Sequence, residues 1–281
     1  MKRVLMIGLP YFTSNVKLNL SRYDKSNKYI ALNTYYRKID KIRFLFLLPF
    51  CHSVYSINGT IDHSFAISLA LKLKKKVVFH WVGSDVKTAQ KAYSENNYNK
   101  KFIEKTIHLT DTPWYLNELE KIGIKAHFQP LIVLEKMEKK QSLPAMFSVL
   151  IYIPQNSQEF YGIHTLKSIA EKLPNIQFDV IGTENPVIPM PKNVTFHGWV
   201  KNTHTYIQNA CVCLRFPEHD GLSFFVLESL SLQRYVIYNQ KLDFTIYAKN
   251  ENEIIEQLVR LKGEFDKGIL NANTKASEWV E

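Results

Sequence analysis

Two carboxylates, Asp220 and Glu228, are the residues whose type and spacing most suggest chemistry. An apolar run, Ala210–Leu214, precedes them and predicts a buried strand of a parallel sheet. Gly221 then predicts a turn, because glycine adopts backbone angles that other residues resist. A helix should begin close to Ser223, since apolar residues recur at helical spacing from there on. These residues are Leu222, Phe225, Val226, Leu230 and Leu232.

A helix end beside two carboxylates suits an anionic ligand that also carries hydroxyl groups. The unpaired N–H groups of the first helical turn bind anions, so a diphosphate could lie near Ser223. A carboxylate accepts hydrogen bonds from ribose or sugar hydroxyls. A nucleotide-sugar combines both features. The alternative is structural: Asp220 caps the helix and Glu228 is a solvated surface residue.

The segment from Asp220 to Leu230, followed by Arg234-Tyr235-Val236-Ile237, resembles a motif of the GT-B-fold glycosyltransferases, in particular glycosyltransferase family 4. The family motif has two glutamates separated by seven residues, and this chain has the same spacing with Asp in the first place. In the family the first acid faces the transferred sugar and the second binds the ribose. The resemblance assigns these roles to Asp220, as a catalytic-site residue, and to Glu228. It also places Gly221, Leu222 and Ser223 against the donor.

The resemblance implies an α/β fold with two Rossmann-like domains facing a central cleft. It implies a hexosyltransferase-like enzyme that moves a sugar from a nucleotide-sugar to a glycan, lipid-linked or other acceptor. Retention of configuration, without a metal and without a cofactor, is part of that expectation. The alternative is a catalytically silent scaffold of the same fold that binds a partner or a membrane. Two features favour it: the chain lacks the cations that hold the diphosphate in the family, and it lacks the family's second glycine-rich loop after Ile237.

The two cations that hold the diphosphate in the family are not found at their usual places. After the first strand of the second domain this chain has Gln155 and Asn156, and before the following glycine it has Tyr161. Arg215, at the end of the predicted strand before Asp220, is the nearest replacement. We hypothesise that Arg215 binds the diphosphate. The alternative is an ion pair between Arg215 and Glu218.

Other residues with expected binding roles lie at the ends of further predicted strands. Trp199 follows a short strand and a glycine, so its indole could stack on the nucleobase or belong to the core. Gly8 ends the first strand and is expected to let the acceptor approach the backbone. His80, as a catalytic-site residue, and Asp85, as an acceptor ligand, follow the strand from Val77 to Trp81. The alternatives are a core histidine and a helix N-cap.

Length and composition fit a two-domain protein of a reducing compartment. The chain has 281 residues, of which 46% are hydrophobic. We expect an acceptor domain over 1–140, a nucleotide-sugar domain over 146–262 and a polar tail over 263–281. The chain has three cysteines, Cys51, Cys211 and Cys213, and their spacing suggests neither a disulfide framework nor a metal site. No segment has the length of a transmembrane helix, so we expect a cytoplasmic protein.

The positive charge is concentrated in the first half. Residues 1–140 contain 24 Lys and Arg against 11 Asp and Glu, a net charge of +13. Residues 141–281 contain 12 against 15, a net charge of −3, so the whole chain carries +10. An anionic partner or a biased composition would explain it. Residues 37–50 combine four cations with a dense apolar run, which is typical either of a peripheral contact with the inner face of an anionic membrane or of a buried helix. No nucleic-acid-binding motif accompanies the charge.

Overall fold

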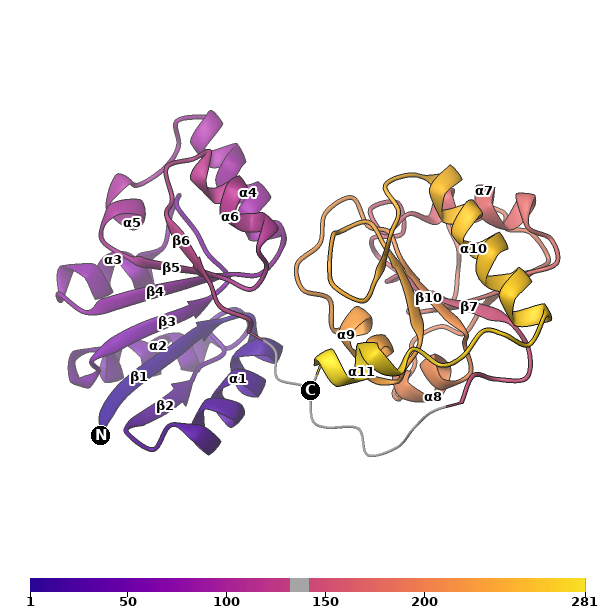
Figure 1. Ribbon diagram of the computed structural model, residues 1–281. Coiled ribbons are helices and arrows are strands. Elements are labelled where there is room, and N and C mark those ends of the chain that lie inside the picture. The colour runs from indigo at the N-terminus through magenta and orange to yellow at the C-terminus, as the bar shows by residue number, and fades with distance from the viewer. Residues whose placement is uncertain (132–141, 281) are drawn as a thin grey trace. The chain divides into compact units, whose positions relative to one another are not determined.

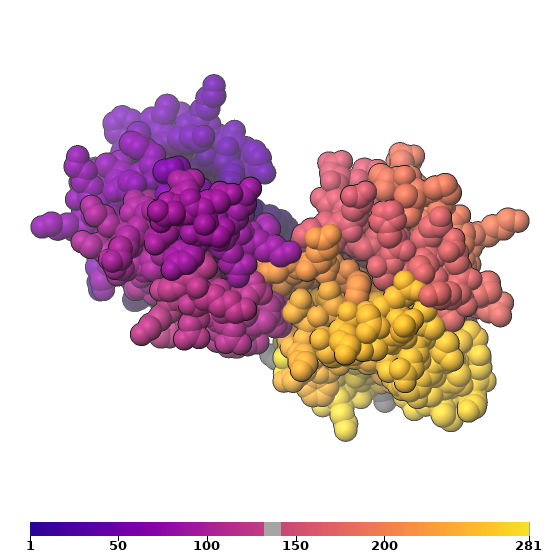
Figure 2. All heavy atoms as spheres, turned by 90° about the horizontal axis from the view of Figure 1, so that it is seen from above, coloured from indigo at the N-terminus to yellow at the C-terminus, as the bar shows by residue number. Residues whose placement is uncertain are grey.

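The computed structural model describes residues 1–131 and 142–280, and the chain divides into two compact units, Met1–Val133 and Leu134–Glu281. Each unit is an α/β sandwich around its own parallel sheet (Figure 1). Each unit is a compact mass of atoms in the space-filling view (Figure 2). The boundary expected at residue 140 lies outside the described residues.

Unit 1 has a six-stranded parallel sheet in the order β2-β1-β3-β4-β5-β6. The strands are β1 (Lys2–Gly8), β2 (Asn27–Ala31), β3 (Ser53–Ile57), β4 (Lys76–Trp81), β5 (Ile107–Thr110) and β6 (Ala126–Phe128). The helices between them are α1 (Pro10–Tyr23), α2 (Lys38–Leu47), the 3-10 turn η1 (Leu48–Phe50), α3 (Phe65–Lys72), α4 (Ser84–Ser94), α5 (Lys100–Glu104) and α6 (Trp114–Glu120).

Helices cover both faces of this sheet because successive strand residues point to opposite sides. On β1, Val4 and Met6 pack in one core with Val16 of α1. Leu5 and Ile7 pack on the other face in a core that includes residues of α2, α3 and α4. The continuous apolar sequence of β1 therefore reflects a strand that is buried on both faces.

Unit 2 has a second six-stranded parallel sheet in the order β12-β11-β10-β7-β8-β9. This is the strand order of the dinucleotide-binding Rossmann fold. The strands are β7 (Ser148–Tyr152), β8 (Gln177–Ile181), β9 (Val194–Phe196), β10 (Val212–Arg215), β11 (Tyr235–Tyr238) and β12 (Ile246–Tyr247). The helices are α7 (Ile163–Lys172), α8 (Thr203–Gln208), α9 (Phe224–Ser231), α10 (Glu251–Asp266) and α11 (Thr274–Val280).

The helices of unit 2 form two layers: α7 and α10 lie on one face of the sheet, and α8, α9 and α11 lie on the other (Figure 1). The stretch expected as a polar tail is therefore structured. Helix α11 packs against α9, and Gln233 Nε2 donates to Ser277 Oγ at 3.2 Å. The sequence pattern missed this helix because its apolar side is only two or three residues wide.

Each sheet has one place where the strand order reverses, and ligands of open α/β sheets bind beyond the carboxyl ends of the strands there. The reversal lies between β1 and β3 in unit 1 and between β7 and β10 in unit 2. Cys51, Cys211 and Cys213 are buried and free. Among the described residues, no helix is long and apolar enough to span a bilayer.

Gly8 sets the end of β1 against β3. Its φ is +110°, and a Cβ built there would lie 1.8 Å from the carbonyl oxygen of Ile57. Gly8→Ala should therefore lower the free energy of unfolding by about 3 kcal/mol or more. Gly123 is the matched control, because its φ is +76° but no atom would meet a Cβ there.

Gly123→Ala should cost only the left-handed backbone term of about 1 kcal/mol. Urea unfolding followed by circular dichroism measures both variants. Equal losses for the two alanines would mean that the contact with Ile57 is not the constraint.

Candidate functional site

The carboxyl end of β10 carries the predicted chemical residues of unit 2. All four residues of β10 are buried, and Arg215 is the last of them. The chain then turns over residues 216–222 and enters α9 through Ser223, whose extended backbone forms the N-cap. This is the strand, loop and helix that the sequence pattern predicts. The loop lies at the reversal point between β7 and β10.

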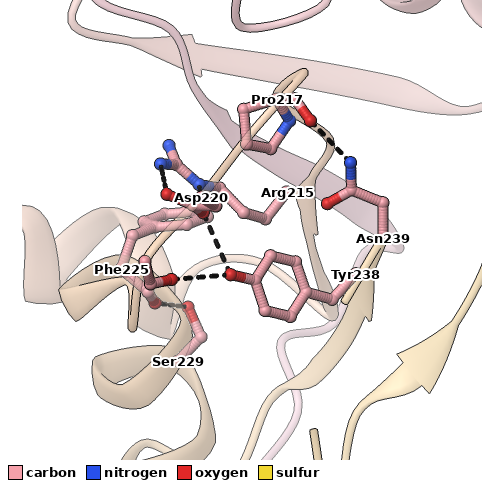
Figure 3. A network of polar contacts seen from close by, with 8 residues as sticks. Arg215, Pro217, Asp220, Phe225, Ser229, Tyr238 and Asn239 are labelled. Atoms are coloured by element: carbon pink, nitrogen blue, oxygen red, sulfur yellow. Dashed lines mark hydrogen bonds and ion pairs between the residues drawn. The ribbon is translucent and has the colours of Figure 1, made fainter. Parts of the chain in front are cut away.

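An ion pair between Arg215 and Asp220 closes this loop (Figure 3). Arg215 Nε donates to Asp220 Oδ2 at 2.7 Å, and Nη2 donates to Oδ1 at 2.8 Å. The Tyr238 hydroxyl on β11 lies 3.1 Å from Asp220 Oδ2 and 3.0 Å from the Gly221 carbonyl oxygen. Only 5% of Arg215 and 9% of Asp220 are exposed. A two-pronged pair of this kind is among the strongest hydrogen-bonded contacts available to these side chains.

Aromatic rings surround the rest of the guanidinium group. Arg215 Cζ lies 4.6 Å from the centre of the Tyr161 ring and 5.9 Å from that of Tyr152, distances at which a cation is attracted to a ring face. Nη1 is buried and has no hydrogen-bond partner in the described part of the chain. Burial alone lowers the pKa of Arg215, but the hydrogen bonds and charge of Asp220 outweigh it and hold the pKa above its ordinary value. Arg215 is therefore a buried, permanent cation.

This geometry differs from the ion pair expected as the alternative for Arg215 and from the free carboxylate expected of Asp220. Arg215 pairs with Asp220 and not with Glu218, which is exposed. Both carboxylate oxygens of Asp220 accept hydrogen bonds from side chains of the protein, so Asp220 does not present a free carboxylate to a sugar. The physical reason is the short Asp side chain, which lies five residues beyond Arg215 across a tight loop. Residue spacing alone did not reveal this pairing.

Glu228 is the carboxylate that remains partly open, with 23% of its side chain exposed. It projects from the second turn of α9 toward α8. The Thr203 hydroxyl donates to Oε2 at 3.2 Å, and His204 Nε2 lies 3.8 Å from Oε1. Burial raises the pKa of Glu228 above its ordinary value, while His204 and the Thr203 hydroxyl act in the other direction. Thr203 and His204 were not singled out from the sequence, since they are distant along the chain.

The other expected donor residues lie around the same end of the sheet. Gly221 is buried, and Leu222 and Ser223 are half-buried at the start of α9. The Ser223 side chain makes no capping hydrogen bond to the helix. Trp199 is 80% exposed in the loop after β9, so it is not the core tryptophan of the alternative interpretation. Tyr161 contacts Arg215 and does not replace the charge of a missing cation.

In unit 1 the structure shows His80 as a buried core residue and Asp85 as a buried residue in the first turn of α4, whose N-cap is Gly83. His80 is fully buried, its Nδ1 lies 2.6 Å from the Tyr55 hydroxyl, and burial lowers its pKa to about 4. The imidazole thus offers no surface to a substrate. Asp85 accepts hydrogen bonds from four backbone N–H groups, including Gly59 at 2.6 Å and Gly83 at 2.8 Å. It ties the loop after β3 to the start of α4.

A pocket of about 640 Å³ lies at the reversal point of the unit 1 sheet. Gly8 and Asp85 are among its lining residues, and most of the rest of its wall was not identified from the sequence. Polar groups come from the loop after β3, and apolar groups come from α2 and α3. The residues that line it include Lys41, Leu45, Asn58, Thr60, Asp62 and Phe65. In the described residues, no three His, Cys, Asp or Glu side chains gather as metal ligands.

Comparisons with known proteins identify the fold. No protein-family model matches the chain, and no curated protein matches it by sequence. Sucrose-phosphate synthase from Thermosynechococcus elongatus has a similar structure, with a TM-score of 0.69 at 11% identity over 100% of this chain and 94% of that one. HepE from Anabaena, solved with UDP and glucose, has a TM-score of 0.62 at 9% identity over 99% and 95%.

A third similar structure is an epimerase rather than a transferase. UDP-GlcNAc 2-epimerase from Neisseria meningitidis, bound to UDP-GlcNAc, has a TM-score of 0.54 at 15% identity over 100% of this chain and 98% of that one. The chain therefore has the GT-B fold of two Rossmann-like domains, as the sequence motif predicted. Since transfer and epimerisation both occur on this fold, the activity has to be argued from the site.

The buried pair gives a stability prediction. Asp220→Ala leaves the guanidinium buried without its counter-charge, and Arg215→Ala does the same to the carboxylate. Each variant should lose about 3 kcal/mol of unfolding free energy. The double variant should lose less than the sum of the two, by about 1–3 kcal/mol.

Chemical denaturation of the four proteins measures this coupling. The exposed pair Lys100–Glu104, with its two charges 3.2 Å apart, is the matched control. Its own cycle should give a coupling of about 0.5 kcal/mol or less. Additive losses at 215 and 220 would show that the pair does not hold the loop.

Proposed function

We propose that this protein transfers a sugar from a nucleotide-sugar donor to a glycan, lipid-linked or other acceptor. One observation carries the proposal: Glu228 is a partly open carboxylate one helical turn beyond the reversal point of a Rossmann sheet. The motif that contains it matches the ribose-binding position of family 4 enzymes in spacing. The same fold holds UDP and glucose in HepE, which supports a uridine nucleotide as donor.

In this proposal Glu228 accepts hydrogen bonds from the two ribose hydroxyls. Thr203 and His204 hold its carboxylate in place, so less side-chain freedom is lost when the ligand binds. The exposed indole of Trp199 is available to stack on the base. Catalysis of transfer would then depend on groups that stabilise the leaving diphosphate.

The leaving diphosphate would lie at the start of α9. The N–H groups there, next to Ser223, carry partial positive charge. Leu222 and Gly221 form the backbone that approaches the ligand. Arg215 acts as a positioning residue, because its ion pair with Asp220 fixes the loop that orients these N–H groups. The transferred sugar would then contact this loop rather than the carboxylate of Asp220.

The acceptor would enter the pocket of unit 1, where hydroxyl and amide groups can bind sugar hydroxyls. Gly8 lets the acceptor approach the end of β1, and Asp85 orders the loop that forms the polar wall. Retention of configuration without a metal accompanies the family 4 resemblance and is part of the proposal. We also propose that the protein lies at the inner face of the cytoplasmic membrane as a peripheral protein that does not span it.

A silent scaffold is the second candidate, and specific observations favour it. Arg215 and Asp220 neutralise one another, and Tyr161 stands where the family has a lysine. Gln155, in the place of the other cation, uses its side chain within the protein: Oε1 accepts from the N–H of Glu184 at 3.0 Å, and Nε2 donates to the Asn185 carbonyl at 2.8 Å. A scaffold would bind nucleotides weakly or not at all.

Glu228 separates the two candidates. We expect UDP to raise the melting temperature of the wild type, since a ligand that binds only the folded state stabilises it. Glu228→Ala should lose this shift and lower the release of UDP from UDP-glucose or UDP-GlcNAc about 100-fold, because a buried hydrogen-bonded contact to a charge is removed.

Glu171→Ala is the control, because Glu171 is an exposed glutamate on α7 of the same unit. It should behave as the wild type in both assays. Full turnover in Glu228→Ala would contradict the assignment, and a wild type without any nucleotide shift would favour the scaffold.

A further inference from the structure

The outer face of α2 is apolar, which is unusual for a surface helix of a water-soluble unit. Ile39, Ile42 and Phe46 recur at spacings of three and four residues and are exposed, with Phe46 at 73%. Phe50, in η1 directly after the helix, is 71% exposed. Leu45 extends the same surface. We call these five residues the α2 face.

The helix is nevertheless anchored to unit 1 by its opposite side. Phe44 and Leu48 are buried in the core of the sheet, and Asp40 is buried one turn before them. Asp40 Oδ2 accepts from the Asn33 N–H at 3.1 Å, and Oδ1 accepts from Arg43 at 2.9 Å. The α2 face is thus held outward by a well-packed helix. The packed helix that was the alternative interpretation of residues 37–50 is therefore present, and it leaves the α2 face exposed.

Cations border the α2 face on its flanks. Arg37, Lys38 and Lys41 are exposed beside it, and Arg43 is exposed on the other flank. At the far end Lys75 Nζ donates to the Pro49 carbonyl at 2.7 Å, which brings a run of three lysines next to η1. The residues of unit 1 belong to the half of the sequence that carries the net charge of +13. An apolar strip with a basic border matches acyl chains below anionic headgroups.

We propose that the α2 face docks unit 1 on an anionic lipid surface, with Phe46, Ile42 and Phe50 entering the boundary between headgroups and acyl chains. Lys38 and Lys41 then meet lipid phosphates. Cations border both flanks and the end of this apolar strip, which matches the continuous anionic plane of a lipid surface.

This surface is continuous with the pocket of unit 1. Lys41 and Leu45 belong to α2 and also line the pocket, and Phe65, 73% exposed, lines it from α3. A headgroup of the docked bilayer therefore lies within reach of the polar wall formed by Asn58 and Thr60. The identity of the acceptor rests on the proposed function: it is a hydroxyl-bearing headgroup carried by a lipid.

Vesicle sedimentation tests the docking without donor, acceptor or turnover, so its result is independent of the proposed function. The full chain is mixed with vesicles of phosphatidylglycerol and phosphatidylcholine, or of phosphatidylcholine alone. We expect binding to the anionic vesicles that weakens with salt and about tenfold less binding to the neutral ones. Ile42→Ser/Phe46→Ser should lower anionic binding about tenfold or more through lost apolar insertion.

Lys38→Ser/Lys41→Ser should also lower binding about tenfold, whereas Lys91→Ser/Lys100→Ser should not. Both pairs remove two positive charges from exposed sites of unit 1, so they separate position from net charge. Far-UV circular dichroism of each variant checks that it is folded. Equal losses from the two lysine pairs would overturn the proposal. So would a wild type that ignores vesicles but changes from dimer to monomer on Ile42→Ser/Phe46→Ser, which would identify the α2 face as a protein interface.

Discussion

The buried ion pair between Arg215 and Asp220 is the constraint on which the site of unit 2 depends. A cation at the end of a strand and a carboxylate five residues later draw the intervening loop into a closed turn. Tyr238 fixes the same carboxylate from the neighbouring strand. With the loop fixed, α9 begins at one place and in one direction. Removing either charge would leave the other buried without a partner, so the two residues act as a unit.

The ion pair gives different roles to two carboxylates that look equivalent in sequence. Both oxygens of Asp220 accept hydrogen bonds within the protein, whereas the side chain of Glu228 is partly exposed. Burial raises the pKa of Glu228, so the folded protein holds its proton more tightly than the unfolded chain does. Its contribution to stability is therefore greatest at acid pH and is lost as the pH rises through the folded pKa. A charge kept in place at a cost to stability is typical of a ligand-binding residue.

The sequence predicted the parts of the fold that depend on local pattern. The β10–α9 unit and the parallel strands followed from apolar runs, from the turn at Gly221 and from the family motif. The pairing of Arg215 with Asp220, and that of Glu228 with Thr203 and His204, depended on side-chain direction and on contacts between distant segments. The four hydrogen bonds of Asp85 are of the same kind. Helix α11 was missed because its apolar side is narrow. The exposure of α2 was not predicted because cations and apolar residues there fit both a membrane contact and a helix packed on the sheet.

Amide hydrogen exchange with and without excess UDP measures most directly whether the loop closed by Arg215 and Asp220 presents α9 and Glu228 to a nucleotide. We expect UDP to slow exchange in the segment from Phe216 to Glu228 and in the start of α8, which carries Thr203 and His204. Binding of UDP without added protection in either segment would contradict this assignment and place the nucleotide elsewhere.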